Sequence, residues 1–243
     1  MFRIIRKIHD YFTLFEKLLY AFGITTIIVF FAVFDKVNWI NLVGSIVGIT
    51  ALLFNAKGNF LGAVFAIIFS VFYGIISYYQ SYYGEMITYL GMTTPLCLIS
   101  LMTWIKHPHE SNIFEVKINK VKKKDIVILI ISSIIVTIAF YFILKALNTN
   151  NLIVSTISIL TSFIAVFFSI KRSPLFNLGY LANDVVLIVL WILSTLQDIS
   201  YINMVACFSV FLILDTYSLF SWLKLEKKQA IEDNLSNNEE TLN

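Results

Sequence analysis

Residues 60–79 read FLGAVFAIIFSVFYGIISYY, a run without a charged residue or a proline. A helix needs roughly 20 mostly apolar residues to cross about 30 Å of hydrocarbon, so this run is long enough to form one membrane span. Across the whole chain, 58% of residues are hydrophobic and 14% are charged, against about 45–50% and about 25% in a typical soluble domain. The composition therefore excludes an ordinary soluble fold.

The same criterion, applied along the chain, predicts an all-α integral membrane protein with eight spans. A basic loop from His107 to Asp125 separates the first four spans from the last four, and we expect the polar tail after Lys224 to be disordered. The expected spans are Leu18–Phe34, Trp39–Ala56, Phe60–Tyr79, Met86–Ile105, Ile126–Leu147, Leu152–Ile170, Leu175–Leu196 and Ile202–Leu223.

The basic residues predict the orientation. If the N-terminus is cytoplasmic, then all of the 18 Lys and Arg residues except Lys36 and Lys145 fall on the cytoplasmic side. Such a bias is typical of cytoplasmic loops. We therefore expect a multi-pass protein of the bacterial inner membrane with both termini in the cytoplasm. Because the basic residues lie between spans, they do not indicate a nucleic-acid partner.

When the sequence is compared with itself at a shift of 118 residues, seven pairs of identical residues coincide. Such a match indicates an internal duplication. The predicted plan is two parallel three-helix repeats, 39–106 and 151–224, joined by a basic loop and linker helix at 107–150. An N-terminal segment with an extra helix, 1–38, precedes them, and a cytoplasmic tail, 225–243, follows. In such transporters the solute binds near the midplane where the repeats meet. The matched pairs are Asn59/Asn177, Tyr83/Tyr201, Met86/Met204, Ser100/Ser218, Leu101/Leu219, Trp104/Trp222 and Lys106/Lys224.

The seventh predicted span carries the most polar face. Asn177, Tyr180, Asp184 and Trp191 share one side of the helix, with Asn183 beside them. A carboxylate and an amide halfway along a span are costly in lipid, so they should face the bundle interior. There they could bind ribose hydroxyls while the rings stack on a base. The alternative is that they form interhelical hydrogen bonds that hold the repeats together.

Three further spans add candidates. Tyr73 and Gln80 share a face with small polar residues that could equally serve close helix packing, and Tyr73 lies 118 residues before Trp191. Asp215 is either a solute contact or the partner of a donor on a neighbouring helix. Tyr89 shares a face with Glu85, which we expect to be solvated at the outer mouth. The full set of expected solute contacts is Asn177, Tyr180, Asn183, Asp184, Trp191, Tyr73, Gln80, Tyr89 and Asp215.

Other side chains are assigned structural roles or none. The serine stripe that includes Ser162 predicts close packing in the sixth span, and Trp104 and Trp222 are expected to anchor helix ends at the membrane interface. Cys97 and Cys207 lie in apolar runs without a CxxC spacing or clustered histidines. We therefore expect no metal, no cofactor and no catalytic residue. No phosphate-binding loop that would indicate ATP coupling is present.

The stretch WINLVGSIVG at 39–48 resembles the opening of the first core helix in the nicotinamide riboside transporter (PnuC) family. Lys57, Asn59 and Gly62 resemble that family's turn into the next helix, and the likeness extends over about residues 39–224. It implies a three-plus-one-plus-three arrangement like that of the SWEET sugar transporters, homotrimers, and facilitated diffusion of vitamins that phosphorylation traps inside the cell.

One departure leaves the solute open. Family members associated with nicotinamide riboside carry a Trp-x-x-Trp pair where this chain has Asn177 and Tyr180. Relatives in the wider group carry thiamine, riboflavin or deoxynucleosides. The competing class, a membrane-embedded enzyme acting on lipids, would need clustered Asp, Glu, His or Lys at a membrane face. A structural or receptor subunit would leave the polar stripes unexplained.

Overall fold

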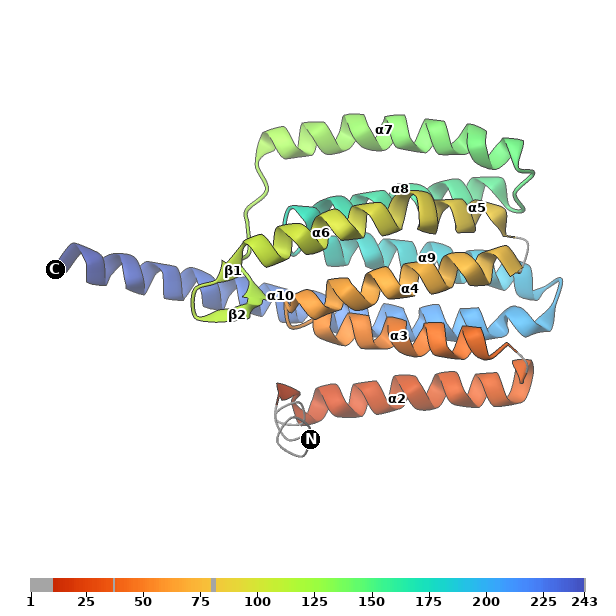
Figure 1. The fold of residues 1–243 in the computed structure, drawn as a ribbon, viewed down its shortest axis with the longest axis horizontal. Coiled ribbons are helices and arrows are strands. Elements are labelled where there is room, and N and C mark those ends of the chain that lie inside the picture. Colours follow the sequence, from red (N-terminus) through yellow and green to blue (C-terminus); the bar gives the residue numbers. More distant parts are fainter. Residues whose placement is uncertain (1–10, 37, 80–81, 243) are drawn as a thin grey trace.

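The computed structural model describes residues 11–36, 38–79 and 82–242, with side chains as far as Leu235. Its helices run nearly parallel or antiparallel to one another in a single bundle (Figure 1). The elements are α2 (Leu14–Phe30), η1 (Phe31–Asp35), α3 (Trp39–Asn55), α4 (Phe60–Tyr79), α5 (Tyr83–Ile87), η2 (Thr88–Thr93), α6 (Thr94–Lys106), β1 (Pro108–His109), β2 (Asn112–Val116), α7 (Lys123–Ala146), α8 (Leu152–Ile170), α9 (Phe176–Thr195), η3 (Ile199–Tyr201) and α10 (Ile202–Leu242).

The all-helical membrane class is confirmed. Within the described residues, 7 helical segments are long and apolar enough to cross a bilayer, and α3 is a shorter apolar helix of 17 residues. At 1.5 Å per residue α3 is about 26 Å long. The first helix begins earlier than expected, at Leu14, because Thr13 and Glu16 form a capping box that satisfies each other's backbone N–H groups.

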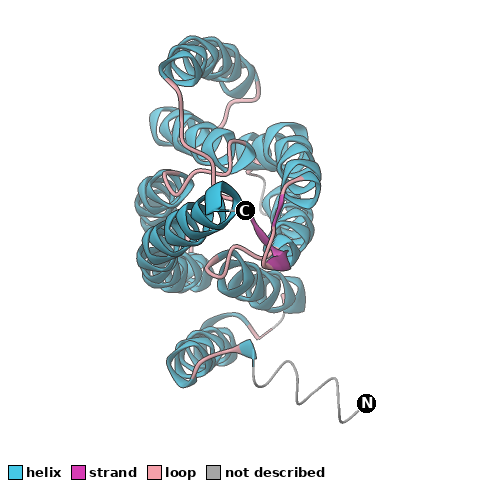
Figure 2. Ribbon diagram, turned by 90° about the vertical axis from the view of Figure 1, so that its left-hand side faces the viewer, coloured by secondary structure: helices cyan, strands magenta, loops and turns pink. Residues whose placement is uncertain are grey.

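Two helices lie at the periphery of the bundle. In Figure 1 α7 runs along the top and α2 along the bottom, and both also stand apart in Figure 2. Only 11% of the most apolar window of each is buried, against 50% in α8. Their exposed faces are apolar and suit contact with lipid. One end of α2 is fixed to the core by Glu16, whose carboxylate contacts Lys57 at 3.2 Å and accepts a hydrogen bond from the Tyr217 hydroxyl at 2.9 Å.

The turns that follow α3 and α8 have the same hydrogen-bond pattern. Gly58 N–H donates to the Asn55 carbonyl and Arg172 N–H donates to the Ser169 carbonyl, both at 2.9 Å. Gly58 and Arg172 also share a left-handed backbone, with φ of 63° and 57°. Glycine adopts this conformation without strain, whereas arginine does so at a cost. The helices α3 and α8 thus end in matching turns.

The expected disordered tail is corrected by the structure. Rather than ending near Lys224, α10 continues through Leu242 and passes beyond the bundle beside the β1–β2 hairpin (Figures 1 and 2). The hairpin lies within the predicted basic loop and pairs with the α3–α4 turn through a bridge from Glu115 to Asn59. Gln229 joins the two, since its amide donates to Glu115 at 2.9 Å and to the Val116 carbonyl at 3.0 Å. These contacts stabilise a segment whose composition alone indicates disorder.

Candidate functional site

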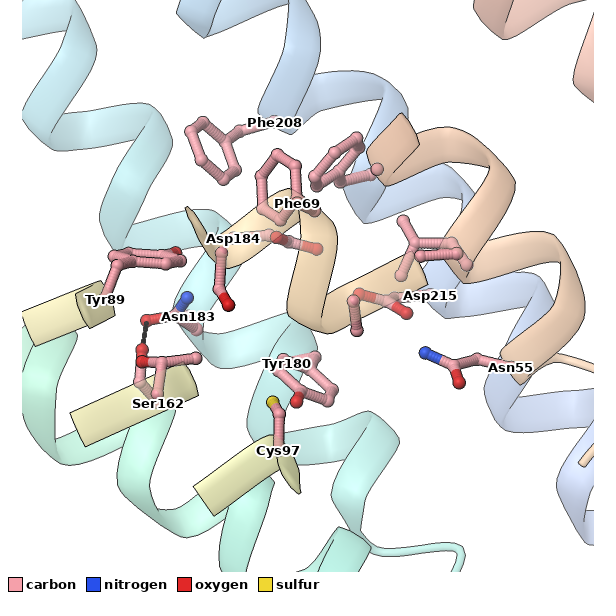
Figure 3. Close-up of a pocket in the computed structure, with 17 residues that line it drawn as sticks. Asn55, Phe69, Tyr89, Cys97, Ser162, Tyr180, Asn183, Asp184, Phe208 and Asp215 are labelled. Carbon is pink, nitrogen blue, oxygen red and sulfur yellow. Dashed lines mark hydrogen bonds between the residues drawn. The ribbon is translucent and has the colours of Figure 1, made fainter. Parts of the chain in front are cut away.

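A narrow cavity of about 60 Å³ lies among α3, α4, the η2–α6 segment, α8, α9 and α10. The peripheral helices α2 and α7 contribute no residue to its lining. Figure 3 shows polar side chains on one side and a group of phenylalanines on the other. The site is therefore amphipathic, as solute pockets generally are.

Asn183 forms the best-anchored polar contact of the cavity. Its side-chain oxygen accepts hydrogen bonds from Thr161 and Ser162 on α8, both at 2.9 Å. With the oxygen occupied, the amide nitrogen is left facing Tyr89 and the cavity (Figure 3). The α8–α9 pair thus holds one donor in a fixed orientation.

Asp184 on α9 and Asp215 on α10 bring two carboxyl groups into the same space. The two residues are 4% and 2% exposed, and both line the cavity. In the described part of the chain, no donor reaches Asp184 Oδ2 or Asp215 Oδ1. A buried carboxyl group without a donor is costly, which makes this pair a candidate position for a ligand.

Four aromatic rings form the apolar wall. Phe69 packs edge-on against Phe211 with ring centroids 5.3 Å apart, and Phe208 packs on Phe211 at 5.5 Å. Tyr89 contacts Phe69 at 6.4 Å. Gly48 allows this packing, because a Cβ at that position would clash with both Phe69 and Phe211. Flat rings of a solute can stack on such a wall.

The π-helical segment η2 positions Tyr89 at the cavity. Pro95 has no N–H and cannot continue the regular ladder of α-helical hydrogen bonds, and the Thr94 hydroxyl donates to the Tyr89 carbonyl at 2.8 Å. The resulting wide turn is a common feature of functional sites in helices. One turn beyond it, Cys97 lies against the Tyr180 hydroxyl (Figure 3).

Aromatic layers lie at both ends of the cavity. Toward the hairpin, Trp104, Trp222 and Phe176 pack together, with the two indole rings 5.4 Å apart. Toward the opposite end, the Trp191 indole donates to the Tyr73 hydroxyl at 2.9 Å, and Tyr82 packs on Trp191 at 5.0 Å.

The structure divides the expected solute contacts into three groups. Tyr180, Asn183, Asp184, Tyr89 and Asp215 line the cavity. Asn177, Tyr73 and Trp191 are buried but lie outside the lining: Asn177 donates to the Pro174 carbonyl, while Tyr73 and Trp191 bond each other. Gln80 falls outside the described residues.

Two expectations about polar and aromatic residues at the helix ends are wrong. Glu85 is fully buried beside Ser155, not solvated at a mouth, because Gly84 lets the chain pack closely on Leu144 and Thr149. Trp104 and Trp222 are 2% and 0% exposed and pack on each other, so neither anchors a helix in the interface.

Several residues of the lining were not predicted from the sequence. Asn55 ends α3 beside the cavity, and Phe69, Phe208 and Phe211 form its wall. Nothing distinguishes these phenylalanines from the other 19 of the 22 in the chain. Ser162 belonged to a stripe assigned to packing, and the signal that could have separated it is its place opposite the polar face of α9. The described residues include no group of three or more His, Cys, Asp or Glu that could hold a metal ion.

Comparison with known proteins gives two matches. A family model described as nicotinamide mononucleotide transporter matches residues 38–224. The fold is similar to a solved structure described as the crystal structure of the vitamin B3 transporter PnuC, with a TM-score of 0.77 and 21% identity over 90% of this chain and 94% of that chain. A search of curated proteins found no match.

Proposed function

Because the chain belongs to the nicotinamide mononucleotide transporter family, we propose that it carries nicotinamide riboside or a related nucleoside-like vitamin across the bacterial inner membrane. Its mechanism is facilitated diffusion, and phosphorylation inside the cell traps the solute. Deoxynucleosides, thiamine and riboflavin are the related solutes that the same cavity has to be tested against. The protein is a transporter, not an enzyme.

The observation that carries this proposal is the amphipathic cavity among the six inner helices. A ribose presents hydroxyl groups, which suit the Asn183 amide and the carboxyl groups of Asp184 and Asp215. A flat base suits the wall formed by Phe69 and Phe211. The cavity therefore offers, on facing sides, the hydrogen-bonding groups and the stacking surface that a nucleoside needs.

The charge of the lining supports a nucleoside over a nucleotide. Among the described residues that line the cavity, none is basic, and two are aspartates. A phosphate group would lie near Asp184 and Asp215 without an arginine or lysine to bind it, which is unfavourable in a buried site.

We further propose that α3 is the eighth span and that 39–106 and 151–224 are parallel repeats linked by α7. Three pairs of lining residues are 118 positions apart, the shift found in the sequence: Ala66/Asp184, Thr93/Phe211 and Cys97/Asp215. The turns after α3 and α8 share a hydrogen-bond pattern at a shift of 114 residues (Gly58 to Arg172), which supports the same pairing of helices with a four-residue difference at this turn. Both termini are then cytoplasmic. The homotrimer implied by the family resemblance can be tested by native mass spectrometry in detergent.

Uptake into proteoliposomes that contain only this protein tests the function. Labelled nicotinamide riboside should equilibrate with the outside and not exceed it, with or without a pH gradient. It should accumulate only when a riboside kinase and ATP are enclosed. Failure to take up any of the four solute types by folded protein would contradict the proposal. Proton-driven accumulation of unmodified solute that Asp184→Asn abolishes would contradict facilitated diffusion.

A further inference from the structure

The loop before α7 lies against the turn that follows α8. Asn119 joins the two, since its N–H donates to the Arg172 carbonyl at 3.1 Å and its side-chain amide donates to the Lys171 carbonyl at 3.3 Å. Residues 119–125 and 171–172, which we call the basic corner, contain six basic residues and one acidic residue. The acidic residue, Asp125, already contacts Lys171 at 2.8 Å. The basic corner therefore carries a strong net positive charge.

Arg172 is the unusual member of the basic corner. Its backbone is left-handed, with a φ of 57°, a conformation that is strained for arginine and not for glycine. Its Nε is buried and, among the described residues, has no hydrogen-bond acceptor. A buried donor without a partner is costly. Backbone strain and an unpaired donor at one residue point to a ligand that the guanidinium holds.

An apolar groove with a volume of about 200 Å³ begins beside the same turn and runs between α8 and α9. Phe168 and Leu175 line the end nearest the turn, and Thr161 and Ala182 line the other end. The groove opens on the outside of the bundle, where Leu178 is 49% exposed. Among the described residues, none lines both this groove and the central cavity. In a membrane, an acyl chain suits such a groove.

We propose that an anionic phospholipid binds at this place, with an acyl chain in the groove between α8 and α9 and its phosphate on the Arg172 guanidinium. A guanidinium binds phosphate through paired N–H donors, and clustered lysines at a membrane face favour anionic lipids. A free phosphate ion would use the basic corner but not the groove. A phospholipid uses both. The site also adjoins the cavity, because Thr161 in the groove donates to Asn183 at 2.9 Å.

Native mass spectrometry of the full chain in detergent tests the choice of ligand. Dioleoyl phosphatidylglycerol and dioleoyl phosphatidylcholine have the same acyl chains, but only the first has a net charge. The first should bind at least about tenfold more tightly, as expected for a charge-assisted contact. Glycerol 3-phosphate, which has the phosphate without the chains, should not displace it at equal concentration. Equal binding of the two lipids, or displacement by glycerol 3-phosphate, would overturn the proposal.

Arg172→Gly separates lipid binding from folding. It removes the guanidinium and leaves a residue that adopts the turn without strain, so the thermal midpoint of the lipid-free protein should not fall. Binding of phosphatidylglycerol should weaken about tenfold, and binding of phosphatidylcholine should stay within about twofold. Lys227→Gln is the control, because it removes an exposed positive charge on α10, and it should change neither. Equal losses in the two variants would mean general attraction by charge and would overturn a site at Arg172.

A second pair of variants tests the groove. Ala182→Trp places a ring in it and should weaken both lipids at least about fivefold, because less acyl chain is buried. Val189→Trp is the control, since Val189 is 45% exposed on the same helix outside the groove, and it should leave binding within about twofold. If a second copy of the chain occupied the groove instead, Ala182→Trp would separate oligomers and leave lipid binding unchanged, which would overturn the proposal. No measurement uses the transported solute, so these results do not depend on the proposed function.

Discussion

Trp104 and Trp222 make the same contact in opposite directions. The Trp104 indole donates to the Ser169 carbonyl on α8 at 2.9 Å, and the Trp222 indole donates to the Asn55 carbonyl on α3 at 2.6 Å. Each tryptophan therefore reaches from its own half of the chain to the end of a helix in the other half. Because the two rings also contact each other, the pair joins the two halves of the chain on the side of the cavity that faces the hairpin.

Trp222→Phe should loosen this layer. The change keeps a ring but removes the indole donor, so it leaves the Asn55 carbonyl without its partner and should lower the free energy of unfolding by about 1–2 kcal/mol. In a Cys207→Ser background, Cys97 in the cavity should also react faster with a small thiol reagent. Unchanged stability and unchanged Cys97 reactivity would show that the layer does not close the cavity.

Asn183→Ala should reduce solute affinity more than Ser162→Ala does. Removing the amide deletes a group that faces the cavity, at a cost of about tenfold in affinity. Removing Ser162 leaves Thr161 still bonded to the same oxygen, so about a two- to threefold loss is expected. Binding measured with one solute on both variants makes the comparison. A larger loss for Ser162→Ala would contradict a solute contact at Asn183.

Cysteine labelling should establish the orientation of the bundle. Asn150 lies in the α7–α8 turn, and Glu110 lies in the hairpin loop at the other end. In a protein lacking Cys97 and Cys207, Asn150→Cys should react with an impermeant thiol reagent in intact cells. Glu110→Cys should react only after the cells are opened. The reverse pattern would invert the topology.

Gln229→Ala should release the end of α10. The side chain donates to Glu115 and to the Val116 carbonyl, and its oxygen accepts from Ile118 N–H at 2.8 Å. Losing these bonds should speed hydrogen exchange in residues 225–235 and cost about 1–3 kcal/mol locally. Lys228→Ala is the control, since Lys228 is 52% exposed and its contacts with Glu115 and Glu232 are long, at 3.8 Å and 3.7 Å, so they should contribute under about 1 kcal/mol. Equal exchange in both variants would contradict a role for Gln229.

Gly179→Ala should destabilise the contact between α8 and α9. A Cβ at Gly179 would lie 2.6 Å from the Ala165 Cα, so the two backbones would have to separate, at a cost of about 1–3 kcal/mol. Gly91→Ala provides the comparison, because its nearest neighbour would be at 3.8 Å. Thermal unfolding in detergent should show a lower midpoint for the first variant only. Equal midpoints would mean that the helices can adjust.

Hydropathy was sufficient to predict the helical membrane class, and the quoted motifs were sufficient for the family, which the family model confirms. Both depend on properties that are local in sequence. The position of a residue along its span can also be read from the local sequence. Asp184 and Asp215 lie near the middle of their spans, where a carboxyl group facing lipid is costly, so both were expected inside the bundle. The neighbours of a side chain in the folded bundle depend on segments that are distant in the sequence. Trp191 shares a face with Asp184, yet its indole donates to the Tyr73 hydroxyl on α4, a contact between residues 118 positions apart.

The disordered tail was predicted for the same reason. The segment after Lys224 is polar, and its composition contains no sign of the hairpin that Gln229 contacts. Glu85 shows the converse, because a charged residue near a helix end is usually solvated and only the packing around Gly84 buries it. In each case the deciding contact joins segments far apart in the chain, which a pattern within one helix cannot show.

The carboxyl groups of the cavity come from one half of the chain only. At the positions 118 residues earlier, where the first half would place their counterparts, the lining has Ala66 and Cys97. If the two halves lined the cavity identically, a solute could bind equally well in two poses related by the symmetry axis between the halves. Because only the second half supplies carboxyl groups, the two poses are not equivalent. A solute that contacts these carboxyl groups is therefore held in one of the two poses.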